Sequence, residues 1–146
     1  MIAVENLRNV ENVLQMMERY KKRENVKYCY DCGHEHAYTP DTDWIKIFGN
    51  KLACVHIHDN LGYDRNADPD AHYLPFDGDL NWDDTLCRLA EAAPQEQLNF
   101  ELKKTTRDPR DQLYDHLSLE QFIAEAGRRA RTLALAYQKL IQTKKA

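Results

Sequence analysis

The sequence is poor in the residues that mark repetitive or disordered chains, with only 5 Gly and 5 Pro among 146 residues. It also lacks an excess of positive charge, since 20 Lys and Arg face 24 Asp and Glu and leave a net charge of −4. Proteins that bind duplex DNA use cationic side chains to neutralise phosphates, so nucleic acid is disfavoured as the main partner. No apolar run approaches the roughly 20 residues of a membrane helix, and no positively charged leader opens the chain. We therefore expect a cytoplasmic protein that does not bind a membrane.

Cysteine is scarce as well, and the four cysteines are predicted to be free thiols rather than a disulfide framework. Cys29 and Cys32 match the spacing C-x-x-C, for which a thioredoxin-like redox pair is an alternative interpretation. That motif normally opens a helix. Here it ends an apolar run of strand character, so the sequence favours two structural thiols.

The order of predicted elements indicates an α/β fold. Four short apolar runs read as buried strands: 2–5, 26–31, 52–58 and 98–102. Helical spacing or capping residues mark the segments between and after them: 10–22, 44–48, 82–92 and 118–142. Strand and helix therefore alternate, which predicts a parallel sheet within one domain spanning 1–146. One long stretch, 60–80, carries Gly and Pro and has the length of a functional loop.

Strand alternation selects four residues of metal-ligand type. Successive side chains on a strand point to opposite faces, so the apolar residues of each run define the helix-covered face. On the other face, near the carboxyl end of each strand, stand Glu5, Asp31, His56 and Glu101. That end is where parallel α/β folds build their sites.

Three carboxylates placed together would repel one another and resist ionisation, and a divalent cation removes that conflict. Three carboxylates and one imidazole favour Mn²⁺ or Mg²⁺, with Co²⁺, Fe²⁺ and Zn²⁺ as alternatives. Taken singly, each acid also fits a helix cap or a surface salt bridge.

Other polar residues lie close by in the sequence. His34 follows Asp31 at D-x-x-H spacing, and His58 shares the face of His56, where it fits a substrate contact or a structural hydrogen bond. A basic group after the last strand fits either a solvated loop or a clamp for a phosphate or carboxylate of the substrate. Its members are Lys103, Lys104, Arg107 and Arg110.

Several motifs together resemble the xylose isomerase-like TIM barrel superfamily, in its sugar phosphate isomerase/epimerase branch. They occur in the family's order over nearly the whole chain: Glu5-Asn6-Leu7, Asp31-Cys32-Gly33-His34, His56-Ile57-His58-Asp59-Asn60, Asp70-Ala71-His72 followed by 75–82, and Glu101. The resemblance implies a (β/α)₈ barrel of which this chain is the C-terminal half, because a full barrel needs about 250 residues.

The resemblance also implies roles for these residues. Glu5, Asp31, His56 and Glu101 would hold the metal, with Glu5 and Glu101 as the catalytic acid–base pair. They would move a proton next to a carbonyl through an enediolate that the metal stabilises. Five further residues are expected to contact a sugar or sugar phosphate: His34, His58, Asp70, His72 and Lys103.

The sequence leaves two alternative functions open, and it also leads to an expectation about association. His34, Asp70 and His72 match extra zinc ligands of endonuclease IV-type AP endonucleases in the same superfamily, so a zinc-dependent phosphodiester hydrolase is one alternative. A truncated half-barrel that binds metal without turnover is the other. A half-barrel exposes two sheet edges, so we expect a homodimer or association with a complementary N-terminal half.

Overall fold

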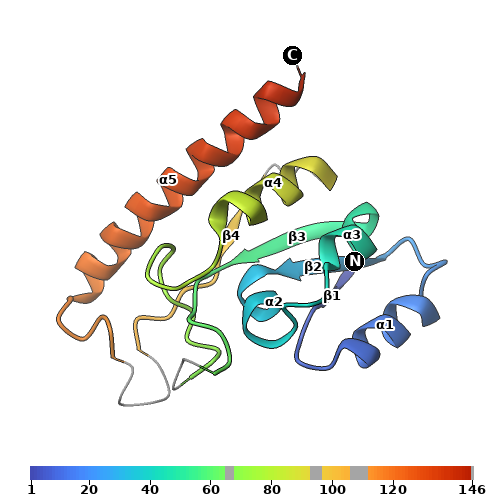
Figure 1. The fold of residues 1–146 in the computed structure, drawn as a ribbon, viewed down its shortest axis with the longest axis horizontal. Helices are drawn as coiled ribbons and strands as arrows, with labels where there is room; N and C mark the ends of the chain where they lie inside the picture. Colours follow the sequence, from blue (N-terminus) through green and yellow to red (C-terminus); the bar gives the residue numbers. More distant parts are fainter. Residues whose placement is uncertain (65–67, 93–96, 106–111, 146) are drawn as a thin grey trace.

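The computed structural model describes residues 1–64, 68–92, 97–105 and 112–145. Its centre is a parallel four-stranded sheet whose strands lie side by side in chain order (Figure 1). The strands are β1 (Ile2–Glu5), β2 (Val26–Asp31), β3 (Leu52–Ile57) and β4 (Asn99–Phe100). This order is that of consecutive βα units in half of a (β/α)₈ barrel, so the predicted fold class is confirmed.

Helices connect the strands and follow the last one. They are α1 (Val10–Arg19), α2 (Cys32–Tyr38), α3 (Trp44–Phe48), the 3₁₀ turn η1 (Gly49–Lys51), α4 (Trp82–Ala92) and α5 (Leu119–Lys145). Local capping sets their starts. The Asn81 side chain accepts a hydrogen bond from the backbone N–H of Asp84 at the start of α4. Ser118 and Gln121 cap α5 reciprocally, each side chain accepting from the other's backbone N–H.

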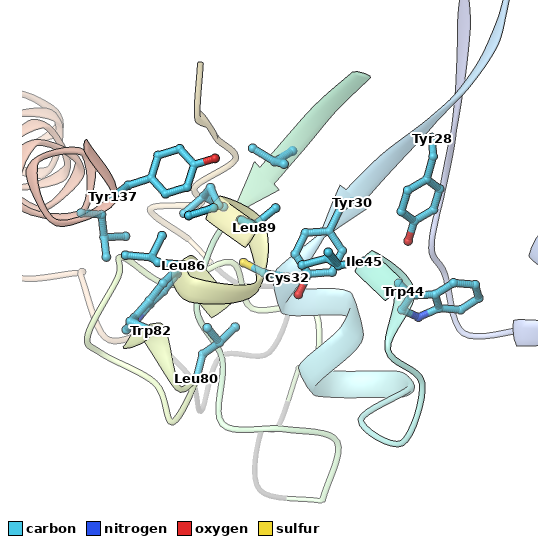
Figure 2. Close-up of a cluster of buried hydrophobic side chains, with 14 of the residues drawn as sticks. Tyr28, Tyr30, Cys32, Trp44, Ile45, Leu80, Trp82, Leu86, Leu89 and Tyr137 are labelled. Carbon is cyan, nitrogen blue, oxygen red and sulfur yellow. The ribbon is translucent and has the colours of Figure 1, made fainter. Parts of the chain in front are cut away.

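The main core lies between the sheet and its helices. Tyr28 and Tyr30 of β2 are fully buried on the face that also receives Trp44 of α3. Figure 2 shows Leu86 and Leu89 of α4 packed between the sheet and α5. On the opposite face of the strands lie Asp31, which follows Tyr30, and His56, which stands between Val55 and Ile57. No helix among the described residues is long and apolar enough to cross a membrane.

The structure differs from the sequence expectations at several element boundaries and in one helix, and α5 ends at Lys145 rather than at residue 142. Helix α2 was not predicted, β4 spans two residues instead of five, and β3 ends at Ile57. Helix α1 ends at Arg19 rather than at residue 22. The residue before α2 explains why this helix forms. The Asp31 side chain caps α2 by accepting a hydrogen bond from the backbone N–H of His34 at 2.7 Å.

Candidate metal centre and substrate site

The four residues that alternation selects do converge. Glu5 and Asp31 end β1 and β2, His56 is the penultimate residue of β3, and Glu101 directly follows β4. Asp31 and His56 are register partners, so the strand ends are aligned. One ligand atom from each residue lies within 4.8 Å of the others. We call Glu5, Asp31, His56 and Glu101 the first cluster.

A single nitrogen of His56 faces all three carboxylates of this cluster. Its Nδ1 lies 2.7 Å from Glu101 Oε2, 3.3 Å from Glu5 Oε1 and 3.6 Å from Asp31 Oδ2. One imidazole nitrogen carries at most one proton, so it cannot satisfy three acceptors. A divalent cation bound by all four residues resolves this convergence. The donor set therefore fits a metal ion of the kind that oxygen-rich sites bind.

The charges of the cluster are stabilised mutually. Burial opposes ionisation of Asp31, but hydrogen bonds from His56 and His58 outweigh it and lower the pKa of the carboxyl group. Burial likewise disfavours ionised Glu5, while His34 and His56 lower its pKa. Hydrogen bonds to Asp31, Cys29 and Glu5 raise the pKa of His56. The lowered pKa values of Glu5 and Asp31 favour their ionised forms, which are the forms that bind a metal ion.

Asn6 fixes the ends of β1 and β2 relative to each other. Its buried amide donates to the carbonyl of Asp31 at 2.8 Å and accepts from the backbone N–H of Asp31 at 2.8 Å. The hydroxyl of Tyr28 also donates to Asn6 Oδ1. Asp31 is therefore held at its backbone as well as at its side chain.

His58 supports Asp31 from behind and is fully buried. Its Nε2 lies 3.0 Å from Asp31 Oδ1, and its ring stacks on His72 with centroids 3.8 Å apart and planes 8° from parallel. The ring packs directly on Gly33, where a Cβ atom would lie 2.0 Å from His58 Cε1. Glycine is thus required for the position of His58 by close approach rather than by its φ angle.

A second cluster lies beside the first and consists of His34, His58, Asp70 and His72, whose ligand atoms also lie within 4.8 Å of one another. Asp70 Oδ1 is 3.1 Å from His34 Nε2 and 2.8 Å from His72 Nε2. Four of the five residues predicted to contact substrate are therefore brought together. The fifth, Lys103, contacts Asp70 from outside at 3.0 Å.

His34 bridges the two clusters. Its Nδ1 lies 3.1 Å from Glu5 Oε1, while its Nε2 contacts Asp70. Burial disfavours the protonated ring, but the hydrogen bonds to Asp70 and Glu5 raise the pKa of His34 to about 10. The protonated imidazole can donate to an oxygen atom placed between the clusters.

The loop that supplies the second cluster is held in an unusual conformation. His72 has a φ of +53°, in the left-handed region that non-glycine residues seldom adopt, and its Nδ1 donates to the carbonyl of Glu101 at 2.7 Å. Asp59 organises the same loop, because its carboxylate accepts from the backbone N–H groups of Phe76 and Leu80 and from Trp82 Nε1.

Sequence reasoning missed the supporting residues Asn6, Gly33 and Asp59. Each stands directly beside a selected ligand or within a quoted motif, but the quoted motifs do not reveal which partner each would meet. Of the basic group, Arg107 and Arg110 lie outside the described residues.

All four cysteines are free thiols, and the two of the C-x-x-C motif, Cys29 and Cys32, are buried. The sequence expectation that this motif does not open a helix is wrong, because Cys32 opens α2 while Cys29 lies in β2. Burial raises the pKa of Cys29 to about 11 and that of Cys32 well above the usual range, whereas reactive thiols have lowered values.

Three comparisons bear on this arrangement. A model of the family described as Xylose isomerase-like TIM barrel matches residues 1–120. A protein of Sinorhizobium fredii described as uncharacterized protein y4fM is 39% identical over 106 residues, which are 68% of this chain and 32% of that protein. A crystal structure described as a D-tagatose 3-epimerase-like protein superposes with a TM-score of 0.64 at 22% identity, over 99% of this chain and 49% of that one. The chain thus spans about a third of the first and half of the second.

Proposed function

We propose that this chain, which belongs to the xylose isomerase-like TIM barrel family, is the metal-binding half of a sugar or sugar phosphate isomerase/epimerase. The observation that carries this proposal is the convergence of three carboxylates on one nitrogen of His56. Mn²⁺ or Mg²⁺ suits the donor set best. When bound, the cation would supply a Lewis acid for a carbonyl oxygen of the substrate.

Exposure divides the three carboxylates into two roles. The side chain of Asp31 is 0% exposed, so it can hold a cation but cannot touch a substrate. Those of Glu5 and Glu101 are 27% and 45% exposed. They come from the first strand and from just after the last strand. We assign Glu5 and Glu101 as the pair that removes a proton next to the carbonyl and returns it, through an enediolate.

The second cluster would orient the substrate. His34 and His72 both present imidazole nitrogens to Asp70, and His34 also reaches Glu5. In this position they can exchange a hydrogen bond with Asp70 for one with a sugar hydroxyl. His58 is buried behind them and serves to position Asp31 rather than to touch substrate.

The test combines metal analysis with hydrogen exchange. The full chain is loaded with Mn²⁺ and incubated with ketoses and ketose phosphates in D₂O. We expect one ion per chain and incorporation of deuterium next to the carbonyl. Glu101→Gln removes a charged ligand and a base together, so it should lower metal affinity and abolish exchange while the fold is kept.

Glu24→Gln, at an exposed position away from both clusters, is the matched control and should change neither property. Full metal affinity and full exchange in Glu101→Gln would refute the assignment. Metal binding without exchange in the unmodified chain would favour an inactive half-barrel.

A zinc-dependent phosphodiester hydrolase of the endonuclease IV type is a second candidate, because the second cluster offers His34, Asp70 and His72 as further ligands. Cleavage of DNA containing abasic sites by the zinc-loaded chain would favour it. The net charge of −4 disfavours a DNA substrate.

We further propose that the half-barrel is completed by a second copy of this chain or by a separate N-terminal half, and that it works in the cytoplasm. Supporting the first point, β1 and β4 each pair on one side alone within the described residues. Supporting the second, the four cysteines are unpaired.

A further inference from the structure

Asp70 already has both carboxylate oxygens occupied by protein groups. Oδ1 faces the two imidazole nitrogens, His34 Nε2 at 3.1 Å and His72 Nε2 at 2.8 Å. Oδ2 accepts from Lys103 Nζ at 3.0 Å. An ion that used the second cluster as a metal site would have to share this carboxylate with the ammonium group.

Lys103 is anchored at three points, so its ammonium group is not a freely moving surface charge. Its backbone N–H donates to the carbonyl of His72 at 3.0 Å. Its Nζ donates to the backbone carbonyl of Asp70 at 3.0 Å as well as to the carboxylate. The lysine therefore ties together the two loop residues that would act as metal ligands.

The charges around the two clusters also disfavour a metal ion in the second cluster. The two clusters together hold four carboxylates: Glu5, Asp31 and Glu101 in the first and Asp70 in the second. With the ammonium of Lys103 and one divalent cation in the first cluster, these four carboxylates leave a net charge of −1. A second divalent cation would instead leave an excess of positive charge beside a fixed ammonium group, which like-charge repulsion disfavours.

We propose that Lys103 is a specificity-determining residue that keeps the second cluster free of metal, so that the chain binds one ion rather than two and His34 and His72 stay available for substrate oxygens. The availability of His34 and His72 for substrate rests on the proposed function, whereas the number of bound ions does not.

The test counts metal ions in the full chain. Metal-free protein is titrated with Co²⁺ and with Zn²⁺, desalted, and analysed by inductively coupled plasma mass spectrometry, with the visible absorption of Co²⁺ as a second readout. We expect one ion for the unmodified chain and for Lys103→Arg, and two for Lys103→Met. The combined variant Lys103→Met with His72→Asn should return to one, which places the added ion in the second cluster.

Lys103→Gln is measured in parallel, because it keeps a polar contact to Asp70 and removes the charge if the methionine variant does not fold. Two ions in the unmodified chain would overturn the inference. So would the absence of a second ion in both Lys103→Met and Lys103→Gln. The two proposals fail separately. No ion in the unmodified chain but one in Lys103→Met would support the role of Lys103 and refute the metal centre of the first cluster.

Discussion

Replacing Gly33 by alanine tests whether the support behind the metal centre is as rigid as the structure indicates. The added Cβ would lie 2.0, 2.3 and 2.5 Å from three atoms of the His58 ring. Carbon atoms in contact normally stay about 3.5–4.0 Å apart, so the ring must move by more than about 1 Å. It has no free space to do so, because it is fully buried and stacked on His72.

The expected magnitude follows from opposing effects. Overpacking costs about 1–3 kcal/mol, and disturbing the hydrogen bond between His58 and the Asp31 carboxylate costs about 1.5–3 kcal/mol. Gly33 lies within α2, so alanine gains about 0.5–1 kcal/mol of helix propensity. These ranges combine to a net loss of about 1.5–5.5 kcal/mol in the free energy of unfolding. Metal affinity should fall about 10- to 100-fold, as when other groups behind metal ligands are disturbed.

Gly127→Ala is the matched control. Gly127 also lies within a helix, α5, but a Cβ there meets no atom within 4 Å. It should gain about 0.5–1 kcal/mol with unchanged metal affinity. Urea unfolding followed by circular dichroism in EDTA measures the free energies, and titration with Mn²⁺ measures the affinity. If Gly33→Ala matches Gly127→Ala in both properties, the packing of His58 on Gly33 does not support the site.

Two further predictions concern pH and assembly. In EDTA, the free energy of unfolding should fall as pH rises from about 6.5 to 9. His34 has a pKa raised from 6.5 to about 10, so its stabilising contribution is complete below 6.5 and is lost on approaching 10. His34→Gln should reduce this slope without removing it, because the pKa of His56 is raised as well. An unmodified chain whose stability stays constant over the interval would contradict the prediction. In sedimentation, we expect the chain to associate at micromolar concentration; a well-folded monomer would count against completion of the half-barrel by a second copy.

The first cluster could be predicted from sequence because it depends on local rules. A period of two along each strand and the alignment of parallel strand ends place Glu5, Asp31 and His56 without any knowledge of the loops. Glu101 was placed by the same rule, although β4 proved to be only two residues long.

The second cluster depends on contacts that no local pattern encodes. Asp70 and His72 lie in a loop that folds back because Asp59 collects distant backbone N–H groups, and His72 needs a left-handed backbone. Helix α2 escaped prediction because Cys32–Tyr38 has no apolar periodicity and depends on the cap from Asp31. The pairing of Lys103 with Asp70 joins residues 33 positions apart.

Within the described residues, β1 and β4 each pair on one side alone, and this restricts what can close the sheet into a ring. Both strands run in the same direction, so the strands that complete the ring must also run in that direction. The first of them would pair with β4 and the last with β1. A second copy turned by half a revolution about an axis along the strands meets this demand at both seams at once. The two metal centres of such a ring would lie at the same end of the barrel, on opposite sides of its axis.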